Sequence, residues 1–271
     1  MPSKDPVTMS PESRELLNQY LTMWRRFTDD HGGADRQKRP GLALRWTDSL
    51  FPFWNMIFLD EEGIGTHLLQ DRLQDAASYM RGRTGMGFVN LFEEQLDDAA
   101  RAALPAVAER AFALSQHAMA GDILPMAEPD HAELRFERVR TDEHLQAYAD
   151  LNSQGYGFPL EAGRTGLVGS TLWKSDQMHA YLALRGDTPV ACAATVADEG
   201  NLFLALVATA PGFQRRGYAT AVVRKALHEG GRATGLTRAT LHASDAGFPV
   251  YSRIGYRKVG TIRTYGLQST S

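Results

Sequence analysis

The chain has 271 residues, 43% of them hydrophobic and 23% charged, with one cysteine and a net charge of −3. This ordinary globular composition excludes disordered, collagen-like and coiled-coil chains, and the low net charge argues against nucleic-acid binding. No apolar run approaches the roughly 18 residues of a membrane span, no secretory signal is visible, and a lone cysteine cannot form an internal disulfide. A cytoplasmic protein that binds neither membrane nor nucleic acid is the expectation.

Charge is distributed unevenly along the chain. Residues 1–130 hold 13 Lys and Arg against 20 Asp and Glu, a net charge of −7, whereas residues 131–271 hold 16 against 12, a net charge of +4. Residues 121–130 contain two prolines, a glycine and three acidic residues, which is typical of a linker. We therefore expect two parts, 1–130 and 131–271, and the mildly basic second part suits a small anionic ligand.

The first part combines helical and extended patterns. Apolar residues recur at helical spacing after Pro11, and Ser10 is placed to cap that helix. Residues 31–41 read as a loop. The predicted elements are a helix over 11–27, a strand over 55–59, a helix over 66–80, a strand over 87–92 and an alanine-rich helix over 97–111, with a break or start near Pro105. This part is therefore predicted to be an α/β lobe.

The second part has a clearer pattern, in which strands are joined by short turns. Turn residues at 185–188 and 198–200 lie between apolar runs, a spacing typical of β-hairpins. Residues 155–169, rich in glycine, read as a loop. The other predicted elements are a strand over 134–140, a helix from Thr141 to 153, strands over 177–184, 189–197 and 201–208, a helix over 216–229 ended by Gly230 and Gly231, a strand over 238–243, a short helix over 248–253 and an extended segment over 256–267.

The turn before the helix at 216–229 carries the most informative chemistry. It reads Gln-Arg-Arg-Gly-Tyr-Ala over residues 214–219. Gly217 lets a ligand approach the backbone, the unpaired amides at the helix start favour an anion, and Arg215 and Arg216 add positive charge. A phosphate or pyrophosphate is the natural guest, and a capped helix with two solvated arginines is the alternative.

This turn resembles the Gln/Arg-x-x-Gly-x-Gly/Ala signature of the GNAT (Gcn5-related) N-acetyltransferase superfamily. Residues 207–211 are similar to the strand end that leads into it, and residues 244–256 resemble the family's short helix and its Tyr-x-x-x-Gly-Phe/Tyr ending. The resemblance covers about residues 133–268 and implies an α/β (α+β) fold with a mixed, mostly antiparallel sheet flanked by helices. Residues 1–130 lack the signature; a degenerate GNAT-like lobe and an unrelated accessory α/β lobe are both open for them.

The resemblance implies acetyl transfer from acetyl-CoA to a primary amine of a small molecule or peptide, with no metal. Backbone groups of Val207 and Thr209 would pair with the pantetheine arm, and an amide near Val207 would polarise the thioester carbonyl. Amides over 215–220 would hold the pyrophosphate. The implied cofactor-binding residues are Val207, Ala208, Thr209, Gln214, Arg215, Arg216, Gly217, Tyr218, Ala219, Thr220 and Ser244.

The resemblance also implies roles for single side chains. Tyr251 stands where many members keep a general acid, and a phenol can protonate the CoA thiolate as it forms; a core tyrosine is the alternative. Ser244 stands where an asparagine often contacts CoA, but a serine is shorter and can instead cap the next helix. Tyr156 and Phe158 are candidates for the acceptor pocket, and His242 is a candidate base.

No carboxylate base is evident on the strand over 238–243. This gap keeps a second hypothesis open, a non-catalytic CoA or acyl-CoA binding module that acts as a sensor or scaffold. An anion-binding domain that never meets CoA is a third. The sequence names neither the acceptor nor the oligomeric state.

Overall fold

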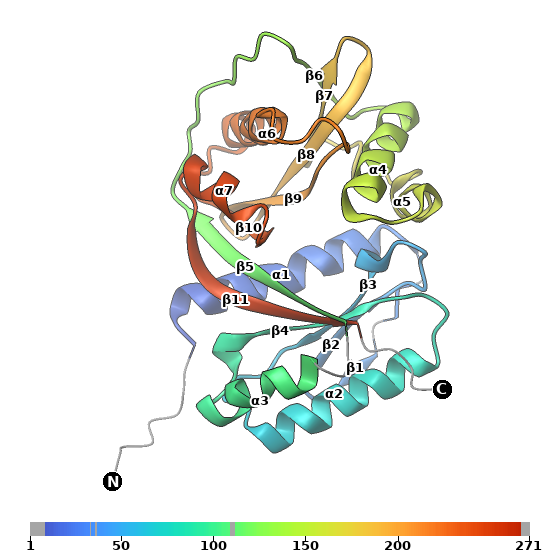
Figure 1. The fold of residues 1–271 in the computed structure, drawn as a ribbon, viewed down its shortest axis with the longest axis vertical. Helices are drawn as coiled ribbons and strands as arrows, with labels where there is room; N and C mark the ends of the chain where they lie inside the picture. Colours follow the sequence, from blue (N-terminus) through green and yellow to red (C-terminus); the bar gives the residue numbers. More distant parts are fainter. Residues whose placement is uncertain (1–8, 33, 36, 109–111, 267–271) are drawn as a thin grey trace. The chain divides into compact units, whose positions relative to one another are not determined.

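The computed structural model describes residues 9–32, 34, 35, 37–108 and 112–266 (Figure 1). They fall into two compact units. Unit 1 ends at Ala118 and resumes at Val259, and unit 2 spans Met119–Lys258. This division by contacts differs from the predicted boundary at residue 130, because Met119 and Leu124 are buried in the core of unit 2. The division into an accessory lobe and a transferase domain at that residue stays a prediction.

Unit 1 is a sheet in the strand order β1-β2-β3-β4-β11-β5 with helices packed on it. β3 and β4 are parallel and are connected by α2, whereas β1–β2, β2–β3 and β4–β11 are antiparallel. Its elements are α1 (Pro11–Asp29), β1 (Lys38–Arg39), β2 (Leu42–Trp46), η1 (Pro52–Trp54), β3 (Asn55–Leu59), α2 (Thr66–Arg81), β4 (Phe88–Phe92), η2 (Glu93–Gln95), α3 (Asp98–Ala108), β5 (Phe112–Gly121) and β11 (Arg257–Gly266). The last three residues of β5 and the first two of β11 are counted with unit 2.

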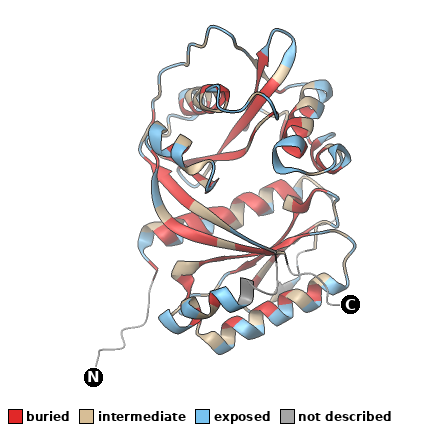
Figure 2. Ribbon diagram, viewed as in Figure 1, coloured by how far each residue is buried: buried red, intermediate tan, exposed pale blue. Residues whose placement is uncertain are grey.

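Helices cover both faces of the unit 1 sheet, and β3 is buried along its whole length (Figure 2). Ile57 belongs to the cluster that contains the apolar residues of α2, while the Phe58 ring lies 4.7 Å from that of Tyr20 on α1. The predicted cap of α1 is confirmed, because the Ser10 hydroxyl accepts a hydrogen bond from the Ser13 amide (3.0 Å). The predicted strands and helices are found, but the break or start expected near Pro105 was wrong, because α3 runs through this residue. Residues 109–111 lie outside the described part. The prediction of a loop over 31–41 was wrong near the end of this range, where β1 forms.

Unit 2 contains an antiparallel meander, β6-β7-β8-β9, followed by β10, which is parallel to β9 and reached through α6. The two predicted hairpins are confirmed. None of the described helices has the length and apolar composition to cross a membrane. The elements are β6 (Arg135–Arg138), α4 (Asp142–Tyr156), α5 (Leu160–Leu167), β7 (Met178–Arg185), β8 (Thr188–Asp198), β9 (Asn201–Thr209), α6 (Tyr218–Thr234), β10 (Ala239–Ser244) and α7 (Phe248–Ile254).

Two predictions for unit 2 were wrong, and glycine packing explains both. Residues 155–169 are not a loop, because α5 forms there. A Cβ on Gly163 would lie 2.5 Å from the Ala149 carbonyl oxygen, so this glycine lets α5 pack closely on α4. Likewise α6 continues through Gly230 and Gly231 to a left-handed cap at Gly235. A Cβ on Gly230 would lie 2.6 Å from the Thr195 hydroxyl, so the glycine brings the helix close to the sheet.

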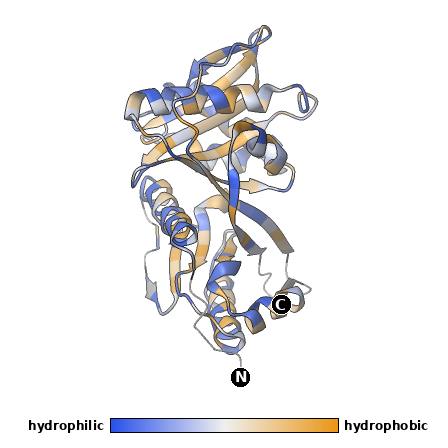
Figure 3. Ribbon diagram, turned by 90° about the vertical axis from the view of Figure 1, so that its left-hand side faces the viewer, coloured by the Kyte–Doolittle hydropathy of each residue, from blue (hydrophilic) through white to orange (hydrophobic). Residues whose placement is uncertain are grey.

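Hydrophilic and hydrophobic residues alternate along the helices of the protein (Figure 3). In α6 the buried residues include Val222, Val223, Ala226 and Leu227, which face the sheet of unit 2. This amphipathic pattern is why the sequence predicts the helix correctly even though its end was misplaced.

Candidate functional site

The end of β9 is irregular at Leu206. This residue has φ +46°, a backbone conformation that residues other than glycine rarely adopt. The pairing register with β8 also shifts, between Cys192 and Ala194. Pairing with β10 ends at Leu204. Among the described pairings, Ala205, Ala208 and Thr209 pair with β8, and the backbone edge of β9 beyond Leu204 has no strand partner on the β10 side. Val207, Ala208 and Thr209 lie on this edge.

Two tyrosine hydroxyls bond to this bulge, and a third tyrosine interacts with both of them. The Tyr148 hydroxyl donates to the Leu206 carbonyl (2.9 Å) and the Tyr156 hydroxyl to the Val207 carbonyl (3.2 Å). Tyr251, on α7, is only 9% exposed, and it interacts electrostatically with both of the other tyrosines. Burial raises the pKa of Tyr251 well above its ordinary value. The structure thus places Tyr251 near the end of β9, with a hydroxyl that stays protonated at neutral pH.

The turn after β9 reaches the start of α6 through three left-handed residues, the first of which is Gly212 (φ +83°). Arg215 has φ +59° and Gly217 has φ +82°, and no side chain caps the helix. Gln214, Arg215, Arg216 and Gly217 are exposed, and the Arg216 guanidinium lies 5.6 Å from the centre of the Phe213 ring. This exposed turn presents positive charge to solvent and leads into the first helical residues, buried Tyr218 and half-buried Ala219 and Thr220. Such an arrangement binds anions.

Sequence reasoning missed a carboxylate beside this turn. Glu133 accepts a hydrogen bond from the Tyr218 hydroxyl (2.5 Å) and lies 3.8 Å from Arg185. The hydrogen bond from Tyr218 lowers the pKa of Glu133, and Arg185, His131 and Arg216 lower it further. The contact joins residues 85 positions apart, and no motif marks Glu133. Only its place directly before a predicted strand could have drawn attention to it.

The remaining predicted side chains have differing surroundings. Ser244 accepts a hydrogen bond from the Gly247 amide (3.2 Å) and so closes the turn before α7. Its alternative role as the helix cap was wrong, because α7 is capped by Gly247 without a side-chain hydrogen bond. The Tyr156 and Phe158 rings are stacked 6.3 Å apart. Burial lowers the pKa of His242 to about 3, and its ring lies 5.3 Å from that of Phe203. A base of such low pKa accepts a proton poorly at neutral pH.

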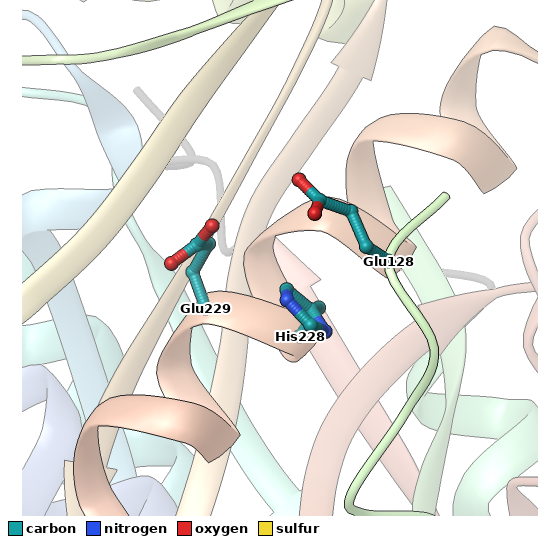
Figure 4. A group of neighbouring side chains, drawn as sticks. All are labelled: Glu128, His228 and Glu229. Atoms are coloured by element: carbon teal, nitrogen blue, oxygen red, sulfur yellow. The ribbon is translucent and has the colours of Figure 1, made fainter. Parts of the chain in front are cut away.

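One group among the described residues has the geometry to hold a metal ion. Ligand atoms of Glu128, His228 and Glu229 lie within 4.8 Å of one another (Figure 4). However, the Lys225 ammonium group already bonds to both carboxylates, and Arg232 bonds to Glu229 (2.8 Å). These cations balance the charge that would attract a metal, so we assign none there. The expected absence of a metal in the reaction stays a prediction.

The sequence around this site also matches a known protein family. The model of the acetyltransferase (GNAT) family matches residues 139–256, which contain the bulge, the basic turn and α7. Residues 139–256 form a GNAT domain. This assignment supports acyl-CoA-dependent acetyl transfer in general and acetyl-CoA as the co-substrate.

Solved structures resemble both units of the chain, although at low identity. A GCN5-related N-acetyltransferase from Kribbella flavida has a TM-score of 0.66 at 17% identity, covering 92% of this chain and 95% of its own. A functionally unknown conserved protein from Staphylococcus epidermidis has a TM-score of 0.60 at 11% identity, with coverage of 86% and 93%. A GCN5-related N-acetyltransferase from Sphaerobacter thermophilus has a TM-score of 0.59 at 13% identity, with coverage of 83% and 75%. No curated protein matches this sequence.

These structural matches extend beyond the GNAT domain into unit 1, which is compatible with a GNAT-like lobe in the first half. At such identities they establish the fold alone. The predicted fold class, a mixed and mostly antiparallel sheet flanked by helices, is confirmed.

Proposed function

We propose that the protein transfers the acetyl group of acetyl-CoA to a primary amine of a small molecule or peptide. One observation carries this proposal: a bulged, unpaired strand edge at 205–209 leads directly into a basic turn and an uncapped helix start. The strand edge suits an amide-containing arm, and the helix start suits a pyrophosphate. Coenzyme A joins these two chemical groups in one molecule.

The cofactor would lie along the end of β9 and across the turn. The Val207 carbonyl already accepts a hydrogen bond from the Tyr156 hydroxyl. The pantetheine arm therefore passes beside Val207 and pairs with backbone groups of Thr209, which leaves the Val207 amide for the thioester. Amides from Arg215 to Thr220 hold the pyrophosphate, and Gln214, Arg215 and Arg216 surround it. Ser244 keeps the turn before α7 in shape, because its hydroxyl is used by the Gly247 amide.

In this reaction the amine attacks the thioester carbonyl, whose oxygen accepts a hydrogen bond from the amide of Val207. The tetrahedral intermediate collapses to an amide and the CoA thiolate. Tyr251 donates its proton to the sulfur and recovers one from solvent, while the amine nitrogen releases a proton to water. Because burial raises the pKa of Tyr251, its hydroxyl remains protonated and acts first as a hydrogen-bond donor to the developing thiolate.

The acceptor amine would arrive uncharged, because His242 is too weak a base to deprotonate it. The rate should therefore rise with pH towards the pKa of the amine. Tyr156 and Phe158, next to the bulge, border the place from which the acceptor approaches. Residues 1–130 serve as an accessory GNAT-like lobe.

Calorimetric titration with acetyl-CoA and with CoA tests the proposal first. We expect micromolar binding of both that weakens with salt, as the charged turn requires. Release of CoA thiol is then measured with a broad panel of amines, for the wild type and for Tyr251→Phe, which should lose most of the turnover while still binding CoA. Absence of binding by either cofactor would overturn the proposal.

A second candidate is a non-catalytic CoA or acyl-CoA sensor. The low pKa of His242 favours it, since no other base was predicted on β10. The sensor would be supported instead by CoA binding without turnover across the whole amine panel, with the same result for Tyr251→Phe as for the wild type.

A further inference from the structure

Three side chains on one face of α4 bond to the bulge of β9 and to the strand beside it. Tyr148, Asn152 and Tyr156 are spaced by four residues, so they lie in a row along the helix. We propose that this row positions the bulge for the reaction, with Tyr148 setting the direction of the amide that polarises the thioester. The inference rests on the proposed function, because it assigns these residues to the same site.

The row binds three consecutive carbonyl groups of the bulge. The Tyr148 hydroxyl lies 2.9 Å from the Leu206 carbonyl oxygen and 3.4 Å from that of Ala205. One helical step further, the Tyr156 hydroxyl lies 3.2 Å from the Val207 carbonyl oxygen. The helix therefore holds the carbonyls of residues 205–207, where the strand departs from regular pairing.

Asn152 connects the middle of the row to the neighbouring strand. Its side-chain amide donates to the Cys192 sulfur (3.3 Å), and the Cys192 thiol donates in turn to the Leu206 carbonyl (3.8 Å). The Leu206 oxygen is thus held from α4 and from β8. Gly155 permits the close approach, because a Cβ there would lie 2.9 Å from the Ala208 Cβ.

Peptide geometry links these contacts to catalysis. In a trans peptide the carbonyl of one residue and the amide N–H of the next point in opposite directions. When Tyr148 holds the Leu206 carbonyl towards α4, the Val207 N–H must point away from α4. That amide is the group proposed to bind the thioester oxygen. The hydroxyl also stabilises the left-handed conformation of Leu206, which costs free energy when left unsupported.

The surroundings of Tyr148 suit a fixed positioning group. Its side chain is fully buried, and its ring packs 5.2 Å from that of Trp173. Burial also keeps its pKa well above the ordinary value, so the hydroxyl remains a donor at every working pH. Tyr156 differs in being 41% exposed, although its hydroxyl lies against the strand. It can therefore be changed with little risk to folding.

The test compares Tyr148→Phe and Tyr156→Phe with Tyr181→Phe, a buried tyrosine of β7 whose ring lies by Lys225. For Tyr148→Phe we expect kcat to fall about 10- to 100-fold, with KM for acetyl-CoA and Kd for CoA within about twofold of the wild type. Tyr156→Phe should show a smaller loss of kcat, and Tyr181→Phe none. A kcat that is unchanged in both row variants, or lowered equally in Tyr181→Phe, would overturn the inference.

Amide hydrogen exchange in the cofactor-free protein separates this inference from the proposed function. We expect faster exchange at residues 205–209 in Tyr148→Phe and in Tyr156→Phe, but not in Tyr181→Phe. If the wild type binds no CoA, the proposed function falls, and the exchange result still decides whether the row holds the bulge. Unchanged exchange in both row variants contradicts the inference even in an active enzyme.

Discussion

Each unit contains a strand, a loop and a helix that returns to a parallel strand, yet the two loops have opposite charge. In unit 1, β3 leads through residues 60–65 into α2 and β4; in unit 2, β9 leads through residues 210–217 into α6 and β10. The loop of unit 1 begins Asp-Glu-Glu, whereas that of unit 2 carries two adjacent arginines. Both helices start without a side-chain cap. The topology alone therefore does not make an anion site.

The acidic loop of unit 1 is also closed by its own ion pairs. Arg14 bonds to Glu62 through two contacts of 2.5 and 2.7 Å, and Arg72 bonds to Glu61 at 2.8 and 2.9 Å. The described pairings of β3 show no register shift comparable to that of β9. The connection from β3 to β4 thus matches that of unit 2 in topology, but residues 55–65 show neither the bulge nor the positive turn. The comparison teaches that charge and strand irregularity distinguish the candidate site from the corresponding connection in unit 1.

The largest expected effect comes from introducing a carboxylate, as found in the loop of unit 1, into the basic turn of unit 2. Gly217→Glu should weaken acetyl-CoA binding at least about 100-fold, because the carboxylate repels the pyrophosphate and the left-handed backbone is strained. Calorimetric titration measures it.

Gly63→Glu is the matched control for this change. Gly63 has φ +68°, and a Cβ at this position would have no atom within 4 Å. A glutamate there would therefore strain the backbone about as much as one at position 217, but in the loop of unit 1. We expect unchanged acetyl-CoA affinity in this variant. Equal losses in the two variants would show that the affinity change reflects general destabilisation and not the turn.

The second prediction concerns how closely each helix lies on its sheet. Gly230→Ala should lower the free energy of unfolding by about 2–3 kcal/mol, since its Cβ would meet the Thr195 hydroxyl at 2.6 Å and Leu202 at 2.8 Å. In α2 the buried small residue is Ala76, and Ala76→Gly should cost about 1 kcal/mol through helix propensity. Urea unfolding measures both, and a Gly230→Ala variant as stable as the wild type would contradict the close packing.

The sequence predicted the elements whose pattern is local. Hairpin turns, amphipathic helices and the Ser10 cap depend on neighbouring residues, and so does the basic turn at 214–217. β5 was missed because Ser, Gln, His and Ala are weak strand formers, and its pairing partners lie far away in the sequence. In the sequence alone the glycines of α5 and α6 indicate breaks, because only tertiary packing shows that they allow close approach.

Within the candidate site, the cofactor turn could be found from a motif, whereas its supporting contacts could not. Tyr148, Glu133 and Cys192 carry no signature, and each acts through a contact with a distant segment. A left-handed Leu206 is equally hidden, since nothing in its side chain favours that conformation. The roles of the predicted site residues stay predictions until cofactor binding is measured.

The third prediction concerns acid stability. Burial alone would raise the pKa of Glu229, but hydrogen bonds from Lys225 and Arg232 lower it to about 2, below the ordinary 4.5. The stability that this carboxylate contributes is therefore present above pH 4.5 and lost as pH falls from 4.5 to 2. Glu229→Gln should remove about 1–2 kcal/mol of that pH dependence in urea unfolding. Glu61→Gln should remove less, because Glu61 is more exposed; the reverse order would contradict the ion-pair assignment.

The smallest expected effect is a gain in acetyl-CoA affinity, opposite in direction to the loss expected for Gly217→Glu. Glu133 places a negative charge beside the proposed anion site, and the hydrogen bond from Tyr218 lowers its pKa and keeps it ionised at neutral pH. Glu133→Gln should therefore tighten acetyl-CoA binding about threefold at low salt, and the gain should shrink as salt screens the charge. Glu62→Gln removes a comparable carboxylate from the loop of unit 1 and should leave binding unchanged. Weaker binding by Glu133→Gln would show instead that the carboxylate acts by holding Tyr218 in place.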